Sequence, residues 1–164
     1  MCGILAIWLG SVAYTRAQTS IETAAQNGAT VTKHASGPFE VNLAPLSTDK
    51  AEGSTITTMS LDKKYHGDLE ATAKGTMLSA GTDVKGSAGY VAIERVTGTL
   101  NGRSGSFVLQ HSGTLTRGAA EQNITVVPDS GTGQFVGLSG KLTVIFEGGG
   151  KHSYNFEYTL PAAP

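Results

Sequence analysis

The chain has one cysteine, Cys2, among its 164 residues. Disulfide frameworks, cysteine nucleophiles and cysteine-based zinc or iron–sulfur sites are therefore excluded from the folded domain. Charged residues make up only 15% of the sequence, and the formal net charge is −1. Such a chain has no basic footprint for nucleic acid and no polybasic face for anionic lipid. We expect neither nucleic acid nor a membrane as a partner of the folded domain.

Long apolar runs are also lacking. The longest, from Cys2 to Tyr14, is shorter than the roughly 20 residues of a membrane-spanning helix. It precedes the small-residue stretch TRAQ, as in a secretory signal peptide, although no Lys or Arg precedes it. We predict a signal peptide over residues 1–17 and export to the periplasm or the medium. A short interfacial helix and a cytoplasmic protein are the alternatives.

Helical periodicity is absent from the rest of the chain. Residues 18–36 are small, polar and aperiodic, which predicts a flexible linker. From residue 37 to residue 164, apolar and polar residues alternate in short runs that glycine interrupts. Leu142, Val144 and Phe146 show this alternation. A period of two is typical of antiparallel strands with one buried face.

Tight turns join about eight such strands. The pair Asn101-Gly102 is the strongest hairpin signal, and glycines also mark turns at residues 129–133 and 148–150. Strands joined in this way form a meander, and a meander removes its free edges by closing into a barrel. We predict one all-β domain over residues 37–164, a closed antiparallel up-and-down barrel of about eight strands. A lipocalin-like barrel of this size holds side chains or one small ligand.

One predicted hairpin, residues 89–115, places a glutamate and a histidine among apolar residues. With Asn101-Gly102 as the loop, Glu94 faces Leu109, and His111 becomes a diagonal neighbour of Glu94. The face with the larger apolar members is assigned to the interior. Its members are Tyr90, Ala92, Glu94, Val96, Phe107, Leu109 and His111.

The glutamate and histidine pair allows two interpretations. A carboxylate and an imidazole side by side can exchange a proton near neutral pH, as general acid–base catalysis requires. A pair that only satisfies its own hydrogen bonds inside the barrel is the simpler alternative. No nucleophile elbow or phosphate loop is present, and the histidines lack the spacing of metal ligands. We predict no metal site and no cofactor.

Three segments resemble a bacterial family known only as domain of unknown function 3224. They are GYVAIERVTGTLNGRSGSFVLQHSGTL, DSGTGQFVGLSGKLTV and HSYNFEYTL, and the similarity extends over roughly residues 37–160. It implies a small closed barrel similar to that of allene oxide cyclase, without an established activity. Glu94, His111 and Tyr90 match a glutamate, a histidine and a tyrosine of the family pattern. Allene oxide cyclases hold an apolar, reactive molecule in such barrels, but a shared fold does not transfer chemistry.

Three functional hypotheses follow. In the first, the lumen binds a small apolar molecule, and the residues that contact it are Tyr90, Glu94, Phe107, Leu109 and His111, with Tyr65 and Tyr158 at the mouth. In the second, the protein is a cofactor-free isomerase or cyclase with Glu94 as base, His111 as its proton partner and Tyr90 as hydrogen-bond donor. In the third, it is a structural module with a filled barrel, whose outward Val91 and Ile93 form a homo-oligomer contact.

Overall fold

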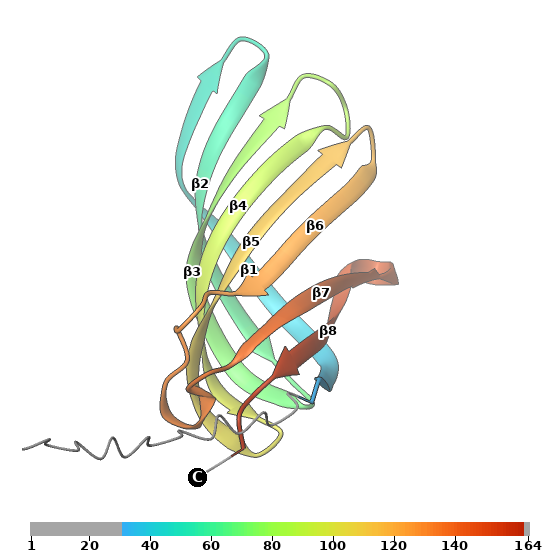
Figure 1. Ribbon diagram of the computed structural model, residues 1–164. Helices are drawn as coiled ribbons and strands as arrows, with labels where there is room; N and C mark the ends of the chain where they lie inside the picture. Colours follow the sequence, from blue (N-terminus) through green and yellow to red (C-terminus); the bar gives the residue numbers. More distant parts are fainter. Residues whose placement is uncertain (1–30, 163–164) are drawn as a thin grey trace, which may run out of the picture.

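A computed structural model describes residues 31–162. Its eight antiparallel strands form a ring in which each strand pairs with its neighbours in the sequence, and β8 returns to β1 (Figure 1). The predicted all-β, up-and-down barrel is confirmed. The strands are β1 (Lys33–Ala51), β2 (Ser54–Tyr65), β3 (Leu69–Thr82), β4 (Ala88–Leu100), β5 (Arg103–Thr116), β6 (Ala119–Val126), β7 (Ser139–Glu147) and β8 (Lys151–Thr159).

The N-terminal boundary of the barrel differs from the predicted one. β1 begins at Lys33, whereas the sequence predicts a linker up to residue 36. Ala35 is buried and pairs with Phe156 of β8, and this pairing satisfies backbone groups that a linker would expose to water. The predicted signal peptide, residues 1–17, lies outside the described residues. Among those described, no helix has the length and apolarity needed to span a membrane.

The β4–β5 hairpin has the predicted register. Glu94 faces Leu109 across the strands. Asn101 and Gly102 have φ angles of 47° and 80°, the positive values that a two-residue turn of this kind requires. Burial alternates along both strands, and the predicted inward face is the one turned to the lumen.

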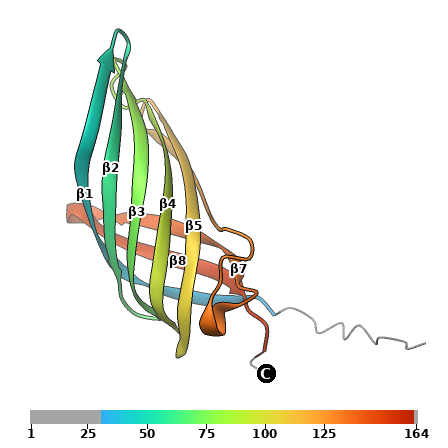
Figure 2. The same ribbon diagram turned by 90° about the vertical axis from the view of Figure 1, so that its left-hand side faces the viewer.

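One half of the barrel, the closed half, is packed with side chains. Phe107 stacks on Phe156 with 5.8 Å between ring centroids and meets Phe135 edge-on at 5.6 Å. Phe135 belongs to a short 3₁₀ turn, η1 (Gly133–Phe135), in the segment between β6 and β7 at this end of the barrel (Figure 2). Each such buried aromatic side chain contributes on the order of 1.5–3 kcal/mol. The closed half therefore holds the fold together.

The other half, the open half, is a curved sheet with two free edges. β6 pairs with β7 at only two positions, Ile124 with Leu142 and Thr125 with Lys141. β1 pairs with β8 only over residues 33–39. Beyond these pairs, the β1–β2, β3–β4 and β5–β6 hairpins rise above the β7–β8 hairpin (Figure 1). The lumen therefore opens to solvent on one side.

Gly75 lets β3 and β4 approach each other closely beside Glu94, its cross-strand partner. A methyl group at this position would collide with the backbone oxygen of Ile93 and with Cα and Cβ of Glu94. None of these atoms is the end of a flexible side chain. A side chain at position 75 would therefore push the two strands apart.

We expect Gly75→Ala to lower the free energy of unfolding by about 1–3 kcal/mol because it overpacks this contact. Gly81→Ala, in the same strand, is the matched control, since nothing lies within 4 Å of a methyl group there. That control should be neutral or slightly stabilising, because alanine loses less backbone entropy on folding than glycine. Urea denaturation followed by circular dichroism measures both, and equal midpoints would contradict the prediction.

Candidate functional site

Glu94 lies at the centre of a buried polar cluster in the lumen. Its Oε1 accepts hydrogen bonds from Lys63 Nζ, Tyr65 OH and His111 Nε2, each at 2.9 Å. The Glu94 side chain is fully buried, and Lys63 and His111 are almost so. Burying a carboxylate is unfavourable by several kcal/mol unless it is paired and hydrogen-bonded. The three donors therefore hold the negative charge inside the barrel.

The strands around Glu94 explain how Lys63 reaches it. Lys63 is on β2 and Glu94 on β4, so β3 lies between them. At this level β3 presents only Ala73, the partner of Lys63, and Gly75, the partner of Glu94. These two small residues leave space for the lysine side chain to cross the sheet. The ion pair between Lys63 and Glu94 thus depends on the absence of large side chains from β3 at this level.

The environment of Glu94 keeps the carboxylate ionised. Burial by itself would raise the pKa of Glu94, but the hydrogen bonds from His111 and Lys63 and the positive charge of Lys63 outweigh it. The pKa of Glu94 therefore lies below its ordinary value of 4.5. The second oxygen, Oε2, is buried and accepts no hydrogen bond from the described residues. Stabilisation of the charge thus rests on the three donors at Oε1.

The two tyrosines near Glu94 are held in the protonated form. Burial, followed by the charge of Glu94, raises the pKa of Tyr65 well above its ordinary value of 10.0. The same two causes, in the same order, raise the pKa of Tyr90. Both phenols therefore keep their protons at neutral pH, and Tyr65 donates its proton to Glu94 in a hydrogen bond.

A cavity extends from this cluster toward the open half of the barrel. Its inner compartment, about 220 Å³, begins at Lys63 and His111. Its outer compartment, about 300 Å³, lies against the inner face of β3 to β6. We call the two together the cup, because they share Met77, Tyr90, Gln122 and Phe146. The inner compartment is also lined by Phe39, Val41, Leu43, Leu61, Val144 and His152.

Two side chains complete the wall of the cup where β6 and β7 separate. Gln122 donates through Nε2 to the backbone oxygen of Val144 at 3.0 Å, and its Oε1 accepts from the Val144 amide at 3.3 Å. This side chain bridges the strands beyond their last backbone pair. Phe146 lies at the junction of the compartments and is 70% exposed. An exposed aromatic ring beside an apolar cavity is suited to cover a bound molecule.

The structure places the predicted site residues in two regions. Glu94, His111 and Tyr90 lie together, with His111 and Tyr90 lining the inner compartment of the cup. Phe107 and Leu109 are fully buried in the closed half and line neither compartment. Both side chains belong to the hydrophobic core of the barrel.

The placement of Tyr65 and Tyr158 at the mouth is wrong. Tyr65 is 1% exposed and donates to Glu94, and Tyr158 is 2% exposed. The Tyr158 oxygen accepts a hydrogen bond from Asn101 Nδ2 at 2.9 Å. Both rings continue the inward rows of their strands into the packed half, where burial of an aromatic side chain stabilises the fold.

Sequence reasoning missed Lys63, although its signal was present. Leu61, Lys63 and Tyr65 form a period-two row, which puts the lysine on the apolar face of its strand. No sequence signal brings Met77, Gln122 and Phe146 together, because they lie on β3, β6 and β7 and meet only through the closure of the barrel. Within residues 31–162, no three His, Cys, Asp or Glu side chains are grouped so as to hold a metal ion.

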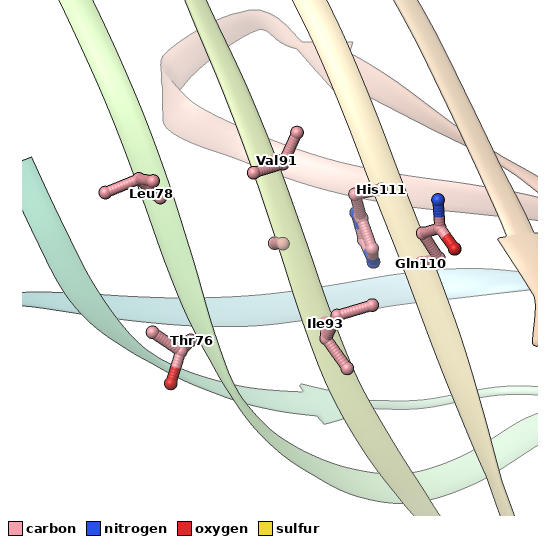
Figure 3. A pocket seen from close by; sticks show the side chains of 7 residues that line it. Thr76, Leu78, Val91, Ile93, Gln110 and His111 are labelled. Atoms are coloured by element: carbon pink, nitrogen blue, oxygen red, sulfur yellow. The ribbon is translucent and has the colours of Figure 1, made fainter.

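The outer face of the sheet carries a separate apolar patch. Leu78, Val91 and Ile93 are each about half exposed beside a shallow depression of about 210 Å³ (Figure 3). Val91 and Ile93 point away from the lumen, as their alternation with Ala92 and Glu94 predicts. This patch therefore lies on the opposite side of the sheet from the cup.

Comparisons with known proteins point to one family. The family model described as "Protein of unknown function (DUF3224)" matches residues 35–158. A crystal structure of a protein with unknown function from this family, from Shewanella oneidensis MR-1, is 46% identical with a TM-score of 0.75. That match covers 81% of this chain and 100% of the other. The comparison with curated proteins gave no match. The family resemblance seen in the sequence is thus confirmed.

We expect Glu94→Gln to lower the free energy of unfolding at neutral pH by about 3 kcal/mol or more, because it leaves buried Lys63 without its counter-charge. The folded state holds the pKa of Glu94 below 4.5, so its contribution to stability is present above that pH. The contribution is lost as the pH falls through the lower, folded-state pKa. The variant should therefore lose less stability than the wild type between pH 5 and pH 3.

Urea denaturation across this pH range measures both effects. Glu157→Gln, an exposed change of the same charge on β8, is the control and should stay within about 0.5 kcal/mol of the wild type. Parallel pH profiles for Glu94→Gln and the wild type would show that Glu94 is not held as an ionised carboxylate.

Proposed function

We propose that this chain, which belongs to the DUF3224 family of proteins of unknown function, binds a small, largely apolar molecule in the cup. The supporting observation is the pair of joined compartments that begin at a buried ion pair and open to solvent. Small-molecule sites are typically concave and mostly apolar, with a few fixed polar groups. The cup has this combination of features. The expected likeness to the allene oxide cyclase barrel stays a prediction, and the proposal does not depend on it.

The size of the cup supports a ligand of modest size. Ligand sites have volumes of roughly 300–1,000 Å³, and the outer compartment alone is about 300 Å³. The closed half shows that this barrel packs aromatic rings tightly where its sequence supplies them. In the open half, Tyr90 lies over Gly113, whose missing side chain leaves room for the ring. The glycine at position 113 thus lets the Tyr90 ring lie against the wall of the cup.

A cofactor-free isomerase or cyclase is the second candidate. The 2.9 Å contact between Glu94 and His111 favours it, as does Tyr90 on the cup wall. The geometry makes Glu94 a weak base, however, because its pKa is lowered and all three donors occupy Oε1. The catalytic assignment of Glu94, His111 and Tyr90 is thus a weaker proposal than binding.

A structural module is the third candidate, supported by the exposed Val91 and Ile93 on the outer face. A homo-oligomer through this patch is compatible with binding in the cup, because the two lie on opposite sides of the sheet. The third candidate by itself leaves the cup without a role. It therefore ranks below the first.

Native mass spectrometry of the protein purified from its own host tests the proposal. We expect a stoichiometric adduct that disappears on denaturation, because a ligand held in the cup loses its site when the barrel unfolds. A bare chain, or a defined oligomer without an adduct, would instead favour the structural module. The mass of the chain also tests the predicted cleavage after Ala17.

We expect Met77→Trp to weaken the binding of the neutral dye Nile red at least tenfold, because Met77 lines both compartments and a larger ring there fills them. Leu78→Trp is the matched control, since the adjacent side chain points to the outer face (Figure 3). Dye fluorescence titrations measure both affinities. Equal loss in the two variants, or none in Met77→Trp, would place the dye outside the cup.

A further inference from the structure

Lys63 is the charged group at the floor of the cup. Its ammonium donates to Glu94 Oε1 at 2.9 Å and to Tyr65 OH at 3.3 Å. An ammonium has three N–H donors, and no hydrogen bond to the described residues takes up the third. Lys63 also lines the inner compartment. A fixed cation with one free donor is thus present where the cavity ends.

Neighbouring side chains hold the ammonium group of Lys63 in a fixed position. Its Nζ lies 5.3 Å from the ring centroid of Phe39 and 5.7 Å from that of Tyr65, within the range of cation–π contacts. Together with the ion pair to Glu94, these contacts remove the freedom of a long side chain. A donor that is ordered before binding loses little entropy when a ligand arrives.

The other polar groups of the inner compartment also favour an acceptor. Tyr90 and His152 each have an O–H or N–H group to donate, whereas the Nε2–H group of His111 is taken up by Glu94. None of the described Asp and Glu residues lines this compartment. Glu94 lies behind Lys63 and His111 and is fully buried. Among the described residues, Glu121 is the one carboxylate beside the outer compartment, and it is exposed on β6.

Resting on the proposed binding function, we propose that the ligand is an organic acid, with an apolar body in the cup and a carboxylate bound by Lys63. A carboxylate accepts charge-assisted hydrogen bonds, which are about twice as strong as neutral ones. A cationic ligand would instead meet the like charge of Lys63, which is unfavourable inside a partly desolvated site. The ligand is therefore expected to carry a negative charge at the end that contacts Lys63.

The test compares three molecules with the same alkyl chain on the full-length protein. Isothermal titration calorimetry at neutral pH measures octanoate, 1-octanol and octylammonium. We expect octanoate to bind about tenfold more tightly than 1-octanol, the effect of one charge-assisted hydrogen bond. Octylammonium should bind most weakly of the three.

Variants then assign the preference to Lys63. Lys63→Met combined with Glu94→Gln removes both buried charges together, so that neither is left unpaired, and should abolish the preference for octanoate. Lys74→Met is the matched control, because Lys74 pairs with Asp62 on the outer face and should keep the full preference. The ligand series on the unaltered chain tests the sign of the charge even where a variant fails to fold.

The outcomes separate the two proposals. Equal binding of octanoate and 1-octanol, or tightest binding of octylammonium, would contradict an organic acid as the ligand, while the binding of an apolar molecule in the cup would still stand. A preference for octanoate that survives in the double variant would show that Lys63 does not bind the carboxylate. If Nile red and all three alkyl compounds fail to bind, the binding function itself is overturned.

Discussion

The buried ion pair between Lys63 and Glu94 is the interaction on which the rest of the lumen depends. Its 2.9 Å contact lies at the boundary between a half filled with aromatic rings and a half that holds a cavity. A charge pair in this position cannot pack like a hydrocarbon side chain, because its polar atoms must keep their hydrogen bonds. The cluster therefore ends the packed core and forms the floor of the cup.

The ion pair also explains small residues that would otherwise weaken the barrel. Glycine within a strand is unfavourable, yet Gly75 stands beside Glu94 where any side chain would collide. Ala73 similarly leaves the path that Lys63 follows across β3. The packed half supplies the stability that these positions forgo. A stable closed half and an open, polar-floored half are thus complementary parts of one barrel.

The local features of the fold were predictable from the sequence because they depend on neighbours along the chain. The Asn101-Gly102 turn sets the register of its hairpin, and that register places Glu94 beside His111. Alternation defined the two faces of the hairpin, and the larger apolar side chains identified the inward one. Tyr65 and Tyr158 were misplaced because alternation gives the side of a strand but not the level along the barrel. That level depends on the stagger of distant strands.

By itself, the sequence determined the all-β class, the meander of strands and the contact between Glu94 and His111. Each follows from a period of two or from a two-residue turn, which act over short distances. Only the tertiary structure decided that Lys63 reaches Glu94, that β6 and β7 separate after two pairs, and that a cup remains above them. These features require strands distant in sequence to meet, and the closure of the barrel sets which of them do.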